Sequence, residues 1–208
     1  MSVPKFSKLS LALTALVGAA VAVPGPAAAQ FSDSYKFLEA VRKKEGDKAT
    51  DMLNEKGSSL INTRDLTSGD SALHIVTQRR DFMWMQFLIG KGANVNNRNT
   101  RGETPLVVAA NLGYIEGVEL LVQFGAKVDE PNSTGETPLI TAVHNRNITL
   151  MRILLKAGAN PDRTDNSGRS ARDYARIDPK AETLLKEIDA SAKPKPKPGE
   201  GTKVFGPK

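Results

Sequence analysis

The chain holds two histidines, His74 and His144, and these are the side chains best suited to proton transfer near neutral pH. They lie far apart in the sequence, and neither belongs to a spacing of histidines and carboxylates that would ligate a metal. Glu103 and Glu136 recur at an interval of 33 residues, so they are copies of one structural position rather than a general acid/base pair. The sequence therefore offers no catalytic constellation built on these residues.

Other kinds of catalytic site are also missing from the sequence. There are no cysteines, which removes disulfides, zinc–thiolate sites, iron–sulfur ligation and cysteine nucleophiles. The glycines are solitary, whereas a phosphate-binding loop needs them clustered, and there is no Gly-x-Ser-x-Gly elbow. We therefore expect a protein that is not an enzyme and that uses no cofactor and no metal.

The formal net charge of +6 is concentrated at the two ends of the chain. Residues 1–29 contribute two positive charges and residues 191–208 contribute four, so residues 30–190 are balanced. A nucleic-acid-binding domain usually carries an excess of Lys and Arg on one face or stripe. The balanced central region therefore argues against a nucleic acid as partner.

An internal repeat of 33 residues organises the central region. Four glycines follow one another at this interval: Gly69, Gly102, Gly135 and Gly168. A second series, in which each glycine is followed by alanine, keeps the same interval: Gly92, Gly125 and Gly158. The first series is followed by similar strings, best matched in Thr104-Pro105-Leu106 and Thr137-Pro138-Leu139. Two landmarks that hold their spacing over several periods indicate stacked repeat units.

This pattern resembles the ankyrin repeat, which opens with Gly-x-Thr-Pro-Leu-His, continues through an Ala-rich first helix and a Leu-Leu second helix, and ends with Gly-Ala-Asp/Asn. The clearest copy runs from Gly102 to Ala126, and the resemblance covers residues 33–190. It implies an all-α solenoid of helix-turn-helix units with projecting β-hairpin loops. It also implies that His74, at the histidine of the opening motif, hydrogen-bonds between repeats.

On this resemblance, residues 30–190 form one ankyrin-repeat domain with modified ends. Its expected parts are an N-terminal cap at 33–65, full repeats at 66–98, 99–131 and 132–164, and a C-terminal cap at 165–190. The helices expected in the caps are Tyr35–Lys44, Lys48–Lys56 and Ala181–Ile188. Modified ends suit a stack in which no single unit can bury its own apolar face.

The physical role of several repeat positions is clear from their residue types. Thr104 and Thr137 can cap a helix N-terminus, each with proline at the first helical position that follows. The glycines that close the second helices are expected in the left-handed conformation: Gly92, Gly125 and Gly158.

Some positions depart from the family pattern. Arg80 and Arg146 replace the inter-helix glycine seen at Gly113, and we expect the tight turn to be accommodated by their neighbours Asp81, Asn145 and Asn147. Trp84 stands at the repeat position of Gly117 in the next unit, so its indole is predicted to fill the space above Gly117. The alternative is that Trp84 is an exposed binding anchor.

The N-terminal segment has the three regions of a secretory signal peptide. Lys5 and Lys8 form a basic start, residues 9–23 are an uninterrupted run of apolar and small residues, and Ala27-Ala28-Ala29 offers a small-x-small cleavage site. The apolar run is shorter than the about 20 residues of a membrane-spanning helix. We therefore predict cleavage between Ala29 and Gln30, and a periplasmic or secreted protein.

The C-terminal residues 191–208 combine a Lys-Pro-Lys-Pro-Lys-Pro run with a glycine-rich end. Alternating proline and like charge cannot bury a core, so we expect a disordered, semi-extended basic tail. It would serve as a solubilising spacer or make a weak, salt-sensitive contact with an anionic envelope surface.

In ankyrin relatives, partners bind the concave surface formed by the hairpin tips and the exposed side of the first helices. Carried over residue by residue, this surface comprises Gln78, Arg79, Arg98, Thr100, Arg101, Glu103, Asn111, Leu112, Ser133, Glu136, His144, Asn145 and Arg169. The three arginines nearest its N-terminal side are expected to lie near one another. Arginine is commonly an interface hot spot, so a protein partner with an acidic patch is expected.

The sequence thus predicts a non-catalytic, monomeric module that acts in the periplasm by stoichiometric binding of a protein partner. Similar exported bacterial ankyrin proteins suggest two versions, support of periplasmic enzymes such as catalases and an immunity protein that blocks a toxic effector. The alternative is an envelope-associated organiser tethered through the basic tail.

Overall fold

The structure is a computed structural model that describes residues 32–56 and 59–191, all within one compact unit of the chain. The predicted signal peptide and Lys-Pro tail lie outside these described residues. Five helix pairs make up the described part, in the order α1 (Asp33–Lys43) and α2 (Gly46–Lys56), α3 (Ala72–Gln78) and α4 (Phe82–Gly90), α5 (Pro105–Asn111) and α6 (Ile115–Gln123), α7 (Pro138–His144) and α8 (Ile148–Lys156), α9 (Ala171–Ile177) and α10 (Ala181–Ser191).

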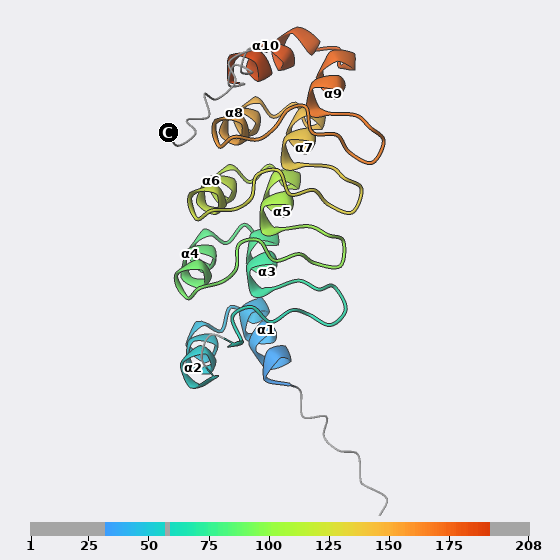
Figure 1. The fold of residues 1–208 in the computed structure, drawn as a ribbon. Helices are drawn as coiled ribbons and strands as arrows, with labels where there is room; N and C mark the ends of the chain where they lie inside the picture. Colours follow the sequence, from blue (N-terminus) through green and yellow to red (C-terminus); the bar gives the residue numbers. More distant parts are fainter. Residues whose placement is uncertain (1–31, 57–58, 192–208) are drawn as a thin grey trace, which may run out of the picture. The chain divides into compact units, whose positions relative to one another are not determined.

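Successive pairs stack so that helices of the same kind pack on one another. The first helices α1, α3, α5, α7 and α9 form one layer, and α4, α6, α8 and α10 pack in a second layer beside it (Figure 1). Long loops connect the pairs and project beyond the first helices (Figure 1). This arrangement confirms the all-α repeat solenoid. No helix among the described residues is both long and apolar enough to span a membrane.

The projecting loops are hairpins without regular strands in the described residues. Isolated antiparallel bridges join Arg64 to Ser71 and Thr164 to Ser170. Backbone hydrogen bonds close the two middle loops, from the Asn99 N–H to the Glu103 carbonyl at 3.0 Å and from the Asn132 N–H to the Glu136 carbonyl at 3.0 Å. The hairpin geometry is therefore present at each loop, although it is too short to make a sheet.

The first helices begin as their sequences predict. The Thr104 and Thr137 side chains accept hydrogen bonds from the third helical amide, and proline occupies the first turn after each of them. At the equivalent positions Ser71 and Ser170 form capping boxes with the side chains of His74 and Asp173. These caps satisfy amides that would otherwise lack a partner at each helix N-terminus.

The cap helices differ from their predicted bounds by a few residues. Lys44 adopts a left-handed conformation with φ 61° and ends α1. The second helix, α2, begins at Gly46, two residues before the predicted Lys48. At the other end α10 continues through Ser191, beyond the predicted Ile188. No proline or glycine interrupts the chain between those two residues, so the helix has no local reason to stop earlier.

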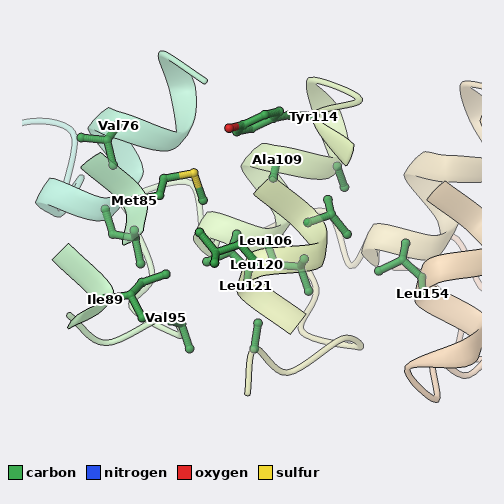
Figure 2. Close-up of a cluster of buried hydrophobic side chains, with 14 of the residues drawn as sticks. Val76, Met85, Ile89, Val95, Leu106, Ala109, Tyr114, Leu120, Leu121 and Leu154 are labelled. Atoms are coloured by element: carbon green, nitrogen blue, oxygen red, sulfur yellow. The ribbon is translucent and has the colours of Figure 1, made fainter. Parts of the chain in front are cut away.

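Aliphatic side chains fill the space between the two helix layers. Figure 2 shows Met85, Leu106, Leu120 and Leu121 converging there, and each of them is buried. Ala109 has no exposed surface on α5, and its small side chain lets neighbouring first helices approach closely. Large aliphatic side chains of the second helices therefore fill the core, and small side chains such as Ala109 let the first helices pack closely.

Left-handed backbone conformations occur at the expected glycines and also at two arginines. Gly92, Gly125 and Gly158 have φ of 89°, 82° and 95° after the second helices, as predicted. Arg80 and Arg146 themselves adopt φ of 55° and 50°, so the expectation that their neighbours take up the turn was wrong. The neighbours Asp81 and Asn147 instead cap α4 and α8 with their side chains.

The predicted packing of Trp84 on Gly117 was also wrong. A Cβ placed on Gly117 would lie 2.4 Å from the Tyr114 ring, so Tyr114 already fills that space from its own turn. Trp84 is half-buried and faces the residues of α2, in the preceding repeat, where it lines a hollow with Gly46 and Thr50.

Candidate functional site

The four hairpins are rigid because each is closed internally and is bonded to the next. One Asp or Asn side chain in each loop accepts backbone N–H groups of the same loop, and these residues are Asp65, Asn99, Asn132 and Asp165. Backbone bonds then link successive loops, from Thr100 to Ser68 at 2.9 Å, from Ser133 to Arg101 at 3.0 Å and from Asn166 to Thr134 at 3.1 Å. We call this arrangement the hairpin ladder.

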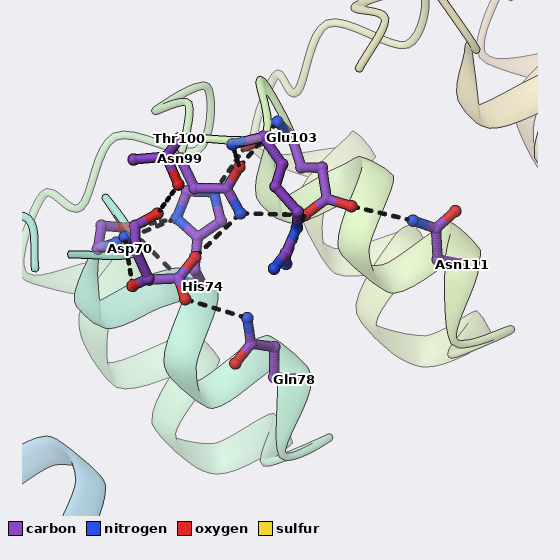
Figure 3. Close-up of polar contacts among 10 residues, drawn as sticks. Asp70, His74, Gln78, Asn99, Thr100, Glu103 and Asn111 are labelled. Atoms are coloured by element: carbon purple, nitrogen blue, oxygen red, sulfur yellow. Dashed lines mark hydrogen bonds and ion pairs between the residues drawn. The ribbon is translucent and has the colours of Figure 1, made fainter. Parts of the chain in front are cut away.

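Polar side chains connect the hairpins to the exposed side of the first helices (Figure 3). Asn99 donates one hydrogen bond to Asp70 and another to Glu103, both at 3.0 Å. Gln78 on α3 donates to Asp70 at 3.3 Å, and Asn111 on α5 donates to Glu103 at 3.4 Å. Asp70 is therefore held by the helix that follows it and by the next loop, and Glu103 is held by the helix that follows it and by its own loop.

The same pattern continues into the last two helix pairs. The Thr141 hydroxyl on α7 lies 3.3 Å from both Asn111 and Glu136, and Glu136 lies 3.0 Å from Nδ1 of His144. The His144 ring meets Tyr174 of α9 edge-on, with ring centroids 4.3 Å apart. The Tyr174 hydroxyl donates to Asp165 at 2.6 Å. The polar network, from Asp70 to Asp165, thus spans four hairpins and four first helices.

Hydrogen bonds hold the two terminal carboxylates of this region in their ionised form. Backbone amides of Ser68 and Thr67, together with Arg42, lower the pKa of Asp65 to about 2. The hydroxyls of Tyr174 and Ser167 hold the pKa of Asp165 well below its usual range. Both hairpins therefore keep their shape across the physiological pH range.

His74 lies beneath the network and connects two repeats. Its Nδ1 accepts the Ser71 N–H at 3.2 Å, so Nε2 carries the proton and donates to the Glu103 carbonyl at 2.9 Å. Burial lowers the pKa of His74, which keeps the ring neutral. The predicted structural role of this histidine is confirmed, and its burial leaves it no access to a substrate.

Three arginines of the predicted surface make different contacts. Arg79 donates to the carbonyls of Val41 and Arg42 at 2.6 and 3.2 Å, so it caps the C-terminus of α1. Arg98 donates to the Pro131 carbonyl at 2.9 Å and pairs with Glu130, so it fixes the next hairpin. Only Arg101 of the three is mainly exposed, and it pairs with Glu103 at 2.7 Å. Two of the three arginines are therefore used inside the fold, and only Arg101 presents most of its side chain to solvent.

Two family models match the chain, both described as ankyrin repeats. One, with three copies, covers residues 37–132, and the other, with many copies, covers residues 121–175. Together they cover well over half of the sequence.

The chain belongs to the ankyrin-repeat family.

Ankyrin repeats generally mediate protein–protein interaction, and ankyrin-repeat proteins are typically non-enzymatic binding modules. Among the described residues, no group of three or more His, Asp or Glu side chains is arranged to hold a metal ion.

This ankyrin-repeat protein exposes most of the predicted binding residues on the hairpins and first helices. The exposed ones are Gln78, Thr100, Arg101, Asn111, Ser133, His144, Asn145 and Arg169. Arg79, Arg98, Leu112 and Glu136 are half-buried, and Glu103 is buried. The exposed set is what a partner could touch, while the buried members shape the ankyrin scaffold that presents it.

Leu66 is the member of the ankyrin surface that sequence reasoning missed. Its side chain is 100% exposed at the tip of the first hairpin, between a hollow that contains Tyr35 and another that contains Thr100. The first hairpin closes from Asp65 to Asp70, one residue more than from Asn99 to Glu103. The signal was in the sequence, because Asp65 precedes Asn99 by 34 residues where the other loop anchors keep 33.

Proposed function

We propose that this ankyrin-repeat protein acts after export, in the periplasm, as a non-catalytic binder of one protein partner. The partner docks on the hairpin tips and the exposed side of the first helices, and the complex is stoichiometric. Support for export comes from the order of basic, apolar and small-residue regions at the N-terminus.

The observation that carries this proposal is the polar network held by the hairpin ladder. Every hairpin is bonded to its neighbour, and the carboxylates between them are fixed by side chains of the first helices. A surface that is ordered before binding loses little conformational entropy when a partner docks. Such a surface suits recognition of a folded protein better than wrapping of a disordered one.

The charges left exposed on this surface favour an acidic partner. Glu103 is buried and Glu136 is engaged with His144 and Thr141, whereas Arg64, Arg101 and Arg169 are exposed on the hairpins. An arginine at an interface can form paired hydrogen bonds with a carboxylate. Leu66 adds an apolar contact at one end, so the partner needs a small apolar depression beside its acidic patch.

The proposed surface is tested with single changes that spare the scaffold. Arg101→Glu and Leu66→Asp alter exposed side chains, and each should weaken partner binding about tenfold or more without loss of helical content. Glu119→Lys, an exposed change on the outer face of α6, is the matched control and should bind normally. Equal binding by all three variants, measured by calorimetry with the isolated partner, would place the site elsewhere.

The proposed location has its own test. The intact mass of protein recovered from a periplasmic fraction should correspond to a chain that begins at Gln30. Recovery of the uncleaved chain from the cytoplasm would refute export while leaving the proposed binding surface intact.

A further inference from the structure

The outer face of α4 is unusually apolar for a second helix of this protein. Met83 is 72% exposed, Phe82 is 37% exposed, and Trp84 and Phe87 are half-buried beside them. The repeat positions equivalent to Met83 hold Glu116 on α6 and Thr149 on α8. The other full repeats therefore place a polar residue where α4 presents methionine to solvent.

A hollow of about 320 Å³ lies between this face and α2. Met83, Trp84 and Phe87 line it from α4, and Gly46, Asp47 and Thr50 line it from α2. The hollow exists because α2 packs less closely on α4 than α4 does on α6. Trp84 and Phe87 meet edge-on with ring centroids 5.7 Å apart, so two aromatic rings form one wall.

The α2 side of the hollow carries a line of carboxylates. Asp47, Asp51 and Glu55 are exposed and stand one helical turn apart. Within the described residues none of the three has a hydrogen-bond or ion-pair partner, whereas Lys48, on the same helix, is paired with Glu45 at 3.0 Å. A ligand that fits here combines apolar rings for the aromatic wall with positive charges for α2.

We propose that this face binds the Lys-Pro-Lys-Pro-Lys-Pro run, residues 193–198, of a second copy of the chain. Proline-rich segments in the extended polyproline conformation dock into aromatic-lined grooves. The polyproline helix has three residues per turn, so the three lysines of the run point to different sides of the segment. One lysine at a time therefore faces the carboxylates of α2 while neighbouring prolines meet the aromatic wall.

The tail comes from a second copy because the run cannot reach the hollow of its own chain. Three helix-to-helix steps separate α10 from α4, by way of α8 and α6. At about 8–10 Å a step they span roughly 25–30 Å. The centre of the run, Lys195, follows the end of α10 at Ser191 by four residues, which span at most about 14 Å.

The resulting association is head-to-tail, since the tail of one copy occupies the α2–α4 face of the next. Three lysines and three prolines give a weak, salt-sensitive contact, so the chain is monomeric when dilute and associates as its concentration rises. The hairpin surface stays free, because the α2–α4 face lies on the other helix layer. Failure of this inference therefore leaves the proposed function untouched.

The only tryptophan of the chain lies in the hollow, so its emission reports occupancy directly. The full chain carrying Lys193→Glu, Lys195→Glu and Lys197→Glu cannot use its own tail and serves as receptor. A synthetic peptide of residues 192–199 should shift Trp84 emission in a saturable way, and several-fold more weakly at 1 M salt. A peptide with glutamate in place of the three lysines is the control and should have no effect.

Analytical ultracentrifugation of the full chain tests the association itself. The wild-type chain should sediment faster as its concentration rises, Met83→Glu should abolish this, and Thr149→Glu at the matched position of α8 should not. The chain with glutamate at positions 193, 195 and 197 should not associate. Adding Asp47→Lys and Asp51→Lys to that chain should restore its association. The proposal would be overturned if the peptide left Trp84 emission unchanged and the chain stayed monomeric at every concentration. It would also be overturned if the tail bound phosphatidylglycerol vesicles while Trp84 emission stayed unchanged.

Discussion

Among single residues, His74 makes the stability of the fold depend on pH. Its ring is neutral and buried between Ser71 and the Glu103 carbonyl, and burial lowers its pKa below the 6.5 of an exposed histidine. As the pH falls through 6.5, the unfolded chain takes up a proton before the folded protein does, so unfolding becomes more favourable. Stability should therefore be greater at pH 7.5 than at pH 5.5, as measured by urea unfolding.

Replacement of the buried imidazole tests this assignment. His74→Gln should lose about 1–3 kcal/mol at pH 7.5, because it leaves buried polar groups poorly bonded, and the remaining stability should change less between the two pH values. An unaltered pH dependence in His74→Gln would show that another group is responsible.

Sequence reasoning was reliable for residues whose role is set by their own repeat unit. His74, Thr104 and Thr137 bond within a few residues or to the adjacent repeat, so their position in the motif was sufficient. It was unreliable for Arg80 and Arg146. Propensity disfavours arginine at positive φ, but the helices on either side over-determine the turn and impose that conformation.

At the scale of the hairpin and the helix, substitutions at two glycines should separate the cost of backbone strain from the cost of a steric clash. Gly125 and Gly135 both have φ 82°, but a Cβ on Gly125 would meet nothing within 4 Å, whereas one on Gly135 would lie 2.5 Å from the Asn166 backbone nitrogen. Gly125→Ala should cost about 1–2 kcal/mol for the left-handed conformation alone. Gly135→Ala should cost more, because it also displaces the next hairpin, and thermal unfolding of the pair measures the difference.

The two arginines of the second hairpin should also differ. Arg98→Ala removes the bond to the Pro131 carbonyl and the pair with Glu130, and should lower the free energy of unfolding by about 1.5–3 kcal/mol. Arg101→Ala removes an exposed pair with Glu103 and should cost at most about 1 kcal/mol. Chemical denaturation of both variants checks this order, and the reverse order would mean that Arg98 is not what holds the third hairpin.

Side-chain positions that depend on how closely neighbouring helices pack could not be predicted from the sequence. The position of Trp84 depends on the looser packing of α2 against α4. The exposure of Leu66, in contrast, depends on one extra residue in the first hairpin, which the interval from Asp65 to Asn99 marks in the sequence. The task of Arg79 depends on the left-handed end of α1, which brings the Val41 and Arg42 carbonyls within its reach. The 33-residue period predicted which helices and hairpins exist. It could not predict contacts that only one repeat makes, because the period is the same for every repeat.

Across the whole molecule, the hairpin carboxylates should set the limit of acid stability. The pKa of Asp65 is about 2 in the folded protein against 3.8 for an ordinary aspartate, and that of Asp165 is lowered further. Their contribution is complete above pH 3.8 and is lost as the pH falls through the folded values. Far-ultraviolet circular dichroism should show the protein losing stability steeply between about pH 4 and pH 2, and Asp65→Asn should make that loss shallower.

The central claim is that a protein partner binds the hairpin surface, and one comparison tests it most directly. Full-length wild-type chain, Arg101→Glu and Glu119→Lys would each be used to capture proteins from a native periplasmic extract, with stoichiometry read from quantitative mass spectrometry. We predict one dominant partner at a constant ratio, retained by wild type and Glu119→Lys and lost with Arg101→Glu. Capture that is equal for all three, or that is lost only with Glu119→Lys, would contradict a binding surface on the hairpins.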